Sequence, residues 1–460
     1  MAYRPPVDFS HNLDHYSDTI VARATPLGSG GVAIIRLSGP QAVNIANLLV
    51  SKDLSNYENR KAYFTTFIDS QKALIDEGLV LVMQGPNSYT GEDVVELQCH
   101  GGMFVVEKIL STAVEFGARM ATGGEFTKRA FLNGKIDLTK AEGICDMIAA
   151  KSKTSHEAAV NHLSGKLEST IHRLMDDLID MAAHFEVSVD YPEEELEIDT
   201  KESMLILLKT KIGSIDNLLA TFQSGHKAKT GTSVCLIGSP NVGKSSIMNT
   251  LLKQQRCIVT STPGTTRDFI EEDFFIQGTH FHLKDTAGIR ATRSNIEKEG
   301  IKASWQAISD TDIVIFVLDT TAPIHRTILD KLNKDKTVVV WNKIDLKEPQ
   351  EKLNFPHIAH LSAKNGQGMH LLEEKLLNLA AQESKENKNA ILITSSRHKK
   401  LLEEAKEDFL RVQEGLKQNL GFELLAFDMK SGLNHLSSII GRNISEDILS
   451  SVFNNFCVGK

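Results

Sequence analysis

Eight residues near the middle of the chain have the composition and spacing of a phosphate-binding loop. Gly238, Gly243, Lys244 and Ser245 fit the pattern G-x-x-x-x-G-K-[ST], which follows the apolar run T-S-V-C-L-I and precedes the helical pattern S-S-I-M-N-T-L-L-K. Glycines let backbone N–H groups surround a β-phosphate, the lysine reaches the β- and γ-oxygens, and the serine hydroxyl binds Mg²⁺. The segment therefore predicts a nucleoside triphosphate site. Its expected nucleotide contacts are Asn241, Val242, Gly243, Lys244, Ser245 and Ser246.

Three later loops, each at the end of an apolar run, supply the other parts of a GTPase site. The D-T-A-G loop offers a carboxylate for the magnesium shell and a glycine amide for the γ-phosphate. The N-K-I-D loop ends in a carboxylate that can accept two hydrogen bonds from the guanine edge, and S-A-K follows at a distance suited to closing over the base. Together the four motifs predict that the nucleotide is GTP. The expected contacts are Asp285, Thr286, Ala287, Gly288, Asn342, Lys343, Asp345, Ser362, Ala363 and Lys364.

The segment between the first two loops is rich in hydroxyl groups and predicts a switch. In T-S-T-P-G-T-T-R-D, Thr266 is placed to reach the magnesium ion. Ras-like proteins orient the attacking water with a glutamine after the D-T-A-G loop, but Ile289 stands there and can neither donate nor accept a hydrogen bond. Glu297 and Glu299 in the following polar run are candidates for that role. The alternative is that this run is a solvated helix face.

The elements that position these loops alternate between short apolar runs and helical patterns. This alternation, from about residue 230 to 384, is typical of an α/β domain with a parallel sheet. In such sheets ligands bind at the carboxyl ends of the strands, and each of the four motifs follows a strand. We therefore expect a Ras-like P-loop GTPase domain over 230–384.

The flanking regions predict two further domains. Residues 1–132 alternate short strands with glycine turns, which is typical of a compact α+β domain, and their polar residues alone fit turn and cap positions. Residues 133–229 and 385–460 carry amphipathic helical patterns. These two stretches predict one discontinuous helical domain into which the GTPase domain is inserted.

Composition limits the remaining classes of protein. The chain has 460 residues, a net charge of −8 and a pI near 6.1, which argues against a chain-wide basic surface for nucleic acid. It has no apolar run of about 18 residues and no apolar signal segment, so we expect a cytoplasmic protein without a membrane anchor. Its five cysteines include no C-x-x-C pair, which predicts free thiols and no zinc site. The tail F-C-V-G-K fails the prenylation pattern because glycine and lysine follow Cys457.

Several motifs in combination closely resemble the MnmE (TrmE) family of tRNA modification GTPases. They are G-S-P-N-V-G-K-S-S, P-G-T-T-R-D, D-T-A-G-I-R and the terminal F-C-V-G-K, and the resemblance runs from I-V-A-R-A-T-P to the last residue. It implies a homodimer that associates through its GTPase domains and uses K⁺ where other GTPases use an arginine finger. Mg²⁺ would bind Ser245 and Thr266. The K⁺ ligands that the resemblance implies are Asn241, Thr260, Thr262 and Thr265, and the same loop, with Ser261 and Thr266, would contact the nucleotide.

The resemblance also assigns roles outside the phosphate loop. It makes Glu297 the residue that orients the attacking water and lets Arg290 help to arrange the switch. It implies a site for 5-formyl-tetrahydrofolate, or a related one-carbon folate, in the amino-terminal domain, which would also serve dimerisation. The residues matching that site are Arg36, Glu96, Lys135 and Lys460.

The implied reaction adds an aminomethyl or carboxymethylaminomethyl group at C5 of the wobble uridine of certain tRNAs. It requires an MnmG (GidA) type flavin protein as partner, in a heterotetramer or larger complex. Cys457 is a candidate nucleophile near the folate site, although the only basic group beside it in sequence is Lys460. Two alternatives stay open, a ribosome-assembly or regulatory GTPase without tRNA chemistry and a folate-binding scaffold gated by GTP.

Overall fold

The computed structural model divides the chain into two compact units. One comprises residues 1–148, 161–212 and 401–460, and the other comprises residues 149–160 and 213–400. The boundaries expected from the sequence, at 132, 229 and 384, stay predictions, since this division does not test them. The structure describes residues 18–54, 57–190, 198–254, 272–284, 311–324, 326–349, 351–382, 391–454 and 456–460.

The amino-terminal part of the first unit is a six-stranded sheet in the order β3-β4-β5-β2-β1-β6. Every pair in it is antiparallel except β1 with β6. Alternating apolar side chains of β2 and β5 form its core with helices α1 and α2, in the mixed α+β arrangement expected. The elements are β1 (Ile20–Arg23), β2 (Gly30–Ser38), α1 (Ala42–Leu49), β3 (Ala62–Ile68), β4 (Leu74–Met83), β5 (Val94–Gly101), α2 (Met103–Glu115) and β6 (Arg119–Met120).

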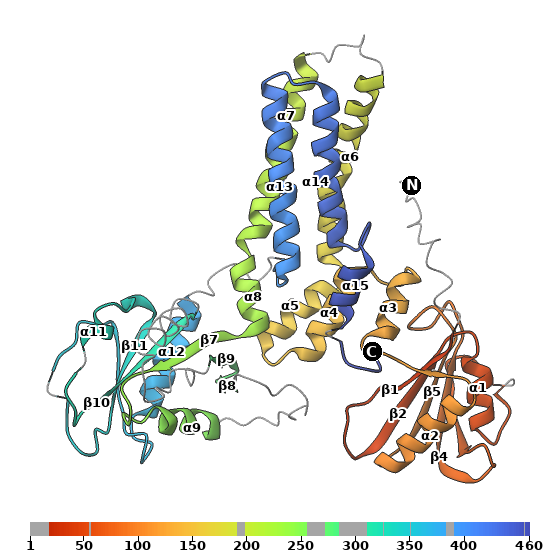
Figure 1. Cartoon of the computed structure of the whole chain (residues 1–460), viewed down its shortest axis with the longest axis horizontal. Coiled ribbons are helices and arrows are strands. Elements are labelled where there is room, and N and C mark those ends of the chain that lie inside the picture. The colour runs from red at the N-terminus through yellow and green to blue at the C-terminus, as the bar shows by residue number, and fades with distance from the viewer. Residues whose placement is uncertain are drawn as a thin grey trace, which may run out of the picture. The chain divides into compact units, whose positions relative to one another are not determined.

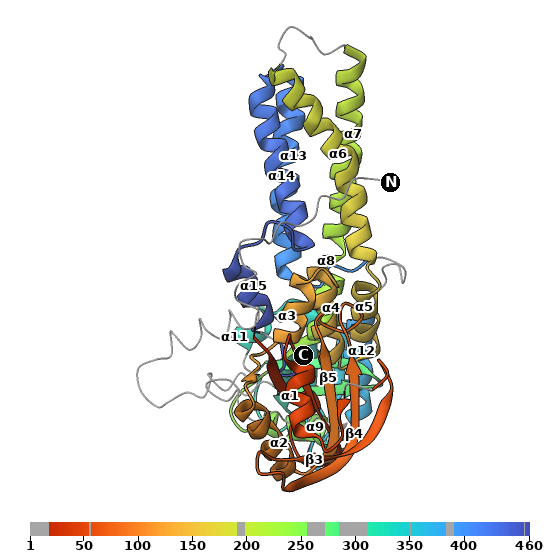
Figure 2. The same cartoon turned by 90° about the vertical axis from the view of Figure 1, so that its right-hand side faces the viewer.

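Helices make up the rest of the first unit. The long helices α6, α7, α13 and α14 run side by side in both views (Figures 1 and 2), and apolar side chains spaced three and four apart face inward from them, as on α6. Two of them follow the amino-terminal region and two come from the end of the chain, so the helical part is discontinuous in sequence as expected. The helices that lie wholly or mostly in this unit are α3 (Glu125–Leu132), α4 (Leu138–Ala149), α6 (Lys166–Asp190), α7 (Ile198–Ala220), α13 (Ser396–Lys417), α14 (Phe422–Ile439) and α15 (Glu446–Phe453), whereas α5 (Lys153–Leu163) lies mostly in the second unit.

The second unit contains a six-stranded sheet in the order β12-β11-β10-β7-β9-β8. Strands β10 and β11 are buried along their whole length, which explains why they are continuous apolar runs rather than alternating ones. The parallel sheet expected from the sequence is confirmed, with an antiparallel edge strand, β8, that the sequence patterns did not indicate. The elements are α8 (Phe222–Thr230), β7 (Thr232–Ile237), α9 (Lys244–Gln254), β8 (Glu272–Ile276), β9 (Thr279–Lys284), β10 (Ile313–Asp319), α11 (Arg326–Leu329), β11 (Thr337–Asn342), β12 (His357–His360) and α12 (Met369–Gln382).

Within the described residues, none of the helices has both the length and the apolar character that a membrane span requires.

Candidate nucleotide and ligand sites

The predicted phosphate loop joins the carboxyl end of β7 to the first residue of α9, as the motif requires. Gly243 has a φ of 101°, in the region that favours glycine. A Cβ atom added to it would lie 2.1 Å from Nδ2 of Asn342. The loop therefore passes so close to the next motif that no side chain fits at this position.

Lys244 lies against its own loop. Its Nζ donates to the carbonyl oxygens of Gly238, at 2.7 Å, and Ser239, at 2.8 Å, and burial lowers the pKa of the ammonium group. The two serines that follow it, Ser245 and Ser246, are exposed at the start of α9. An ammonium group that donates to two neutral carbonyl oxygens beside the amino terminus of a helix has donors suited to phosphate oxygens.

Asn342 links three of the predicted motifs through one carboxamide. Its Nδ2 donates to the carbonyl oxygen of Val242, at 2.7 Å, and its Oδ1 accepts from the backbone N–H of Ala363, at 3.0 Å. Asn342 is buried, whereas Asp345 and Lys364 are exposed. The arrangement leaves the two predicted base-recognition groups accessible while the asparagine holds the loops that carry them.

Lys343 makes a similar link to Asn241, the residue before Val242 in the phosphate loop. Its Nζ donates to the carbonyl oxygen of Asn241, at 3.0 Å, and forms an ion pair of 2.6 Å with Oδ2 of Asp319. Both Lys343 and Asn241 have a positive φ, 67° and 63°. Asp319, at the end of β10, was not among the residues expected from the sequence.

Many predicted nucleotide residues lie outside the described part of the chain. Their expected roles in binding Mg²⁺, K⁺ or the attacking water stay predictions. They are Thr260, Ser261, Thr262, Thr265, Thr266, Asp285, Thr286, Ala287, Gly288, Ile289, Arg290, Glu297 and Glu299.

In the amino-terminal sheet, Arg36 and Glu96 face each other on neighbouring strands. The register pairs them directly, and the Nε and Nη2 atoms of Arg36 lie 2.9 and 2.8 Å from Oε1 of Glu96. The guanidinium group lies over the rings of Tyr89 and Phe126, with centroids 5.4 and 5.7 Å away. Two charged groups and an aromatic surface are thus assembled in one place, with both charged side chains still about 15% exposed.

The end of the chain lies against the same sheet. Val458 forms a bridge with Gly123, and the carbonyl oxygen of Gly459 accepts a 3.4 Å hydrogen bond from Nη1 of Arg36. Gly459 has a φ of 93°, and an added Cβ would lie 2.1 Å from the carbonyl oxygen of Arg23. The tail therefore brings Gly459, the residue before Lys460, into contact with Arg36 of its own chain, while the Cys457 side chain is exposed.

Lys135, the fourth residue expected at this site, contacts the loop that carries Tyr89. Its Nζ donates to the carbonyl oxygen of Pro86 at 2.8 Å. Its side chain also packs against Gly91, where an added Cβ would lie 3.3 Å from the lysine Cγ. The structure thus connects Lys135 to the Arg36 site through the 86–91 loop.

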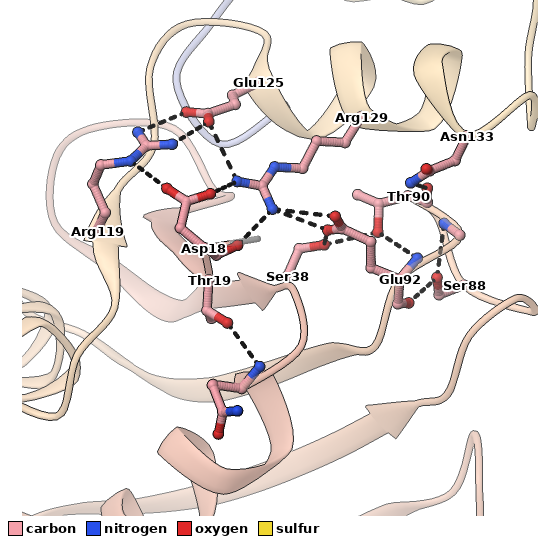
Figure 3. Close-up of polar contacts among 12 residues, drawn as sticks. Asp18, Thr19, Ser38, Ser88, Thr90, Glu92, Arg119, Glu125, Arg129 and Asn133 are labelled. Atoms are coloured by element: carbon pink, nitrogen blue, oxygen red, sulfur yellow. Dashed lines mark hydrogen bonds and ion pairs between the residues drawn. The ribbon is translucent and has the colours of Figure 1, made fainter. Parts of the chain in front are cut away.

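An ion network centred on the buried Arg129 lies next to this loop (Figure 3). Arg129 is 1% exposed, and its guanidinium binds Oδ1 of Asp18 at 2.6 Å and both carboxylate oxygens of Glu92 at 3.2 Å. Arg119 joins it by binding Asp18 and Glu125. Burial alone would raise the pKa of both carboxylates. Hydrogen bonds from Arg119 and Arg129 outweigh burial at Asp18, and hydrogen bonds from Arg119 and the Thr122 backbone N–H outweigh it at Glu125, so both pKa values are lowered.

The same network stabilises the turn that carries Tyr89, through contacts to Thr90 and Glu92. The hydroxyl of Ser38 bonds to both Thr90 and Glu92, and Nδ2 of Asn133 donates to the carbonyl oxygen of Thr90 (Figure 3). The Tyr89 hydroxyl in turn bonds to Thr127 on α3 at 2.8 Å. The Tyr89 ring that contacts Arg36 is therefore held in place by side chains that belong to no recognisable motif.

Models of two protein families match nearly the whole described chain. The TrmE N-terminus model, described as a GTP-binding protein, matches residues 19–135, and the MnmE helical domain model matches residues 138–457. The chain belongs to the MnmE family.

Curated relatives agree with this membership over their full length. The tRNA modification GTPase MnmE of Protochlamydia amoebophila is 41% identical over 99% of this chain and 100% of its own, and that of Syntrophus aciditrophicus is 41% identical over 96% and 99%. The G domain of the T. maritima FeoB iron transporter is 26% identical over 32% of this chain and 98% of its own, with a TM-score of 0.25. The family models and the curated relatives confirm the resemblance and the fold class expected from the sequence, and with them the expectation of a GTPase of this family.

The sequence analysis missed two groups of residues that support the two candidate sites. Asp319 could have been noticed because it ends an apolar strand and is followed by two threonines, as a capped turn often is. Arg129 and its partners carry no such signal. Asp18, Glu92 and Arg129 meet only through the tertiary fold, since 111 residues separate the first from the last.

Proposed function

We propose that this chain is a potassium-dependent GTPase that takes part in modifying the wobble uridine of certain tRNAs. It would add an aminomethyl or carboxymethylaminomethyl group at C5 together with an MnmG-type flavin protein. The observation that carries the proposal is the presence of two built sites in one chain. The Asn342-linked nucleotide site and the Arg36 site with the docked tail are both parts that such a reaction would use.

The nucleotide site suits GTP with Mg²⁺ and K⁺. Lys244 would bind the β- and γ-phosphates, Ser245 would bind Mg²⁺, and Asp345 would bind the guanine edge. Asn241 lies in the same loop as Lys244, so a monovalent ion held by its carboxamide would lie close to the phosphates and offset developing charge. The remaining ligands proposed are Thr266 for Mg²⁺ and Thr260, Thr262 and Thr265 for K⁺, with Glu297 orienting water and Arg290 arranging the switch.

The amino-terminal site suits a folate. A guanidinium, a carboxylate and the Lys135 ammonium provide donors and an acceptor for a pterin edge and a glutamate tail. The rings of Tyr89 and Phe126 are already engaged by Arg36, so they support this arginine from below. Lys460 would add a second ammonium group, and a bound one-carbon folate would supply the carbon unit.

We further propose that Cys457 acts near this folate, either as a nucleophile or as a structural thiol. Its exposure suits attack on an external group, and the terminal Lys460 would be the nearest cation in sequence. Cytoplasmic location, homodimerisation through the G domains and a heterotetrameric or larger complex with the flavin protein complete the proposal.

The experiment that tests the tRNA role is mass analysis of tRNA nucleosides from cells that lack this protein. The modified wobble uridine should disappear and return when the gene is restored. An unchanged uridine would refute the proposal and leave a GTPase without tRNA chemistry, such as one acting in ribosome assembly.

Cation dependence is tested on the purified protein. GTP hydrolysis should be stimulated by K⁺ and lost when Na⁺ replaces it at equal ionic strength. Equal rates in the two salts would remove K⁺ from the proposal without affecting the tRNA role.

A further inference from the structure

The phosphate loop contains a residue in an unfavourable backbone conformation. Asn241 has a φ of 63°, in the left-handed region that residues with a side chain disfavour, although asparagine tolerates it better than most. Such conformations persist where surrounding contacts fix them. The contact that the structure gives the Asn241 carbonyl oxygen is the 3.0 Å hydrogen bond from Nζ of Lys343.

Lys343 is itself held at both its side chain and its backbone, by the last residue of β10 and the residue after it. Its ammonium group pairs with Asp319, and its carbonyl oxygen accepts a 2.9 Å hydrogen bond from the Thr320 hydroxyl. Lys343 also has a positive φ, 67°, which is unusual for lysine. The turn at the end of β10 therefore fixes the direction in which Lys343 points.

Asp319 is itself held in place by the turn that follows it. Its side chain is 9% exposed, and its Oδ1 accepts from the N–H and the hydroxyl of Thr321, at 2.8 and 2.7 Å. The other oxygen is then directed at Lys343 at 2.6 Å. Burial would raise the pKa of Asp319, but the hydrogen bonds from Lys343 and Thr321 outweigh this effect, and the pKa is lowered. The carboxylate is therefore charged at neutral pH.

The next residue of the loop is supported by a different group. The Val242 carbonyl oxygen accepts from the Asn342 carboxamide and has no part in the Asp319 chain of contacts. Removing the Asp319 charge should therefore loosen Asn241 while the rest of the phosphate loop stays in place.

We propose that Asp319 is a positioning residue that acts through Lys343 to hold Asn241 in the orientation needed to bind the monovalent cation. The inference rests on the proposed function, because it takes Asn241 to be a cation ligand. It assigns Asp319 an effect on the cation requirement of GTP hydrolysis and little effect on nucleotide affinity.

The test compares Asp319→Asn with the wild-type full-length protein. Asparagine keeps an acceptor for Thr321 and removes only the charge that Lys343 pairs with. The K⁺ concentration giving half-maximal GTP hydrolysis should rise about three- to tenfold, as expected for loss of one charge-assisted contact. The maximal rate at saturating K⁺ and the affinity for a fluorescent GDP analogue should stay within about twofold, which a general loss of structure would not allow.

Two further variants control the result. Asp330→Asn neutralises an exposed carboxylate further along the same unit and should leave the K⁺ curve unchanged. Asp319→Glu keeps the charge and should give a half-maximal concentration between those of the wild type and Asp319→Asn, so the inference can be judged even if the asparagine variant is unstable.

Three outcomes are distinguishable. A K⁺-dependent wild type with an unshifted Asp319→Asn curve would overturn the role of Asp319 alone, as would a loss of maximal rate without a shift. A wild type that is equally active in Na⁺ would overturn both this inference and the proposed potassium requirement.

Discussion

The nucleotide site and the amino-terminal site are assembled in opposite ways. In the first, each group belongs to a short motif at the end of a strand, and a single asparagine ties the motifs together. In the second, Arg36 meets a strand partner 60 residues away and a tail residue 423 residues away. The difference teaches that parallel strand ends bring local motifs together by topology, whereas the second site depends on individual side-chain contacts.

The largest effect expected at the nucleotide site comes from Glu297→Ala. If this carboxylate orients the attacking water, GTP turnover should fall by at least about a hundredfold while GDP affinity is kept. Rates under single-turnover conditions and titration with a fluorescent GDP analogue measure the two quantities. Glu299→Ala is the matched control, and a wild-type rate for Glu297→Ala together with loss in Glu299→Ala would exchange their roles.

The next largest effect is expected from a steric change that should weaken nucleotide binding and leave folate binding unchanged. In Gly243→Ala the new Cβ would meet Nδ2 of Asn342 at 2.1 Å, so nucleotide affinity should fall at least about tenfold while folate affinity is unchanged. Gly278→Ala is the control, because Gly278 also has a positive φ, 81°, but no heavy atom within 4 Å of its Cβ position. Calorimetric titration with GDP and with 5-formyl-tetrahydrofolate measures both affinities. Equal losses in the two variants would mean that general destabilisation, and not the Asn342 contact, lowers the affinity.

Gly459→Ala should have the opposite effect, weakening folate binding and leaving GTP hydrolysis unchanged. The added Cβ would collide with the carbonyl oxygen of Arg23, so the tail should move away from Arg36. Folate affinity should fall about tenfold, while the GTPase rate at saturating K⁺ stays at the wild-type value. Cys457→Ser, which changes an exposed side chain in the same tail, should keep the affinity. An unchanged affinity in Gly459→Ala would show that the tail does not contribute to the folate site.

The smallest effect concerns an ion cluster on the β8–β9 hairpin of the second unit. Burial would raise the pKa of Asp273, but hydrogen bonds from His280, Lys151 and His282 outweigh it and lower it. A lowered folded-state pKa gives stability that is complete above the ordinary aspartate value of 3.8 and is lost as the pH falls through the lower folded value.

Asp273→Asn should therefore lower the free energy of unfolding of this unit by about 1–2 kcal/mol at pH 7. The difference from the wild type should begin to shrink as the pH falls below 3.8 and disappear only below the lowered folded-state pKa. Thermal unfolding followed at several pH values measures it. Asp330→Asn is again the matched control, and a difference that stays constant with pH would exclude the charge as the cause.

The contrast between the sites also explains what the sequence could predict. The four nucleotide motifs, the strands that end in them and the discontinuous helical part were predicted because their signals are local and periodic. Strand β8 was missed, since it is a short edge strand paired only with β9. Asp319 was missed because its partner Lys343 follows a neighbouring strand and is distant in sequence. Arg129 was missed because the residues of its ion network have no characteristic spacing in the sequence.

The hydrogen bond between Arg36 and Gly459 closes a loop of almost the entire polypeptide. The entropy cost of closing a flexible loop grows only with the logarithm of its length, by about 0.6 kcal/mol for each doubling. Lengthening or shortening the segment between these residues would thus hardly change the cost of bringing them together.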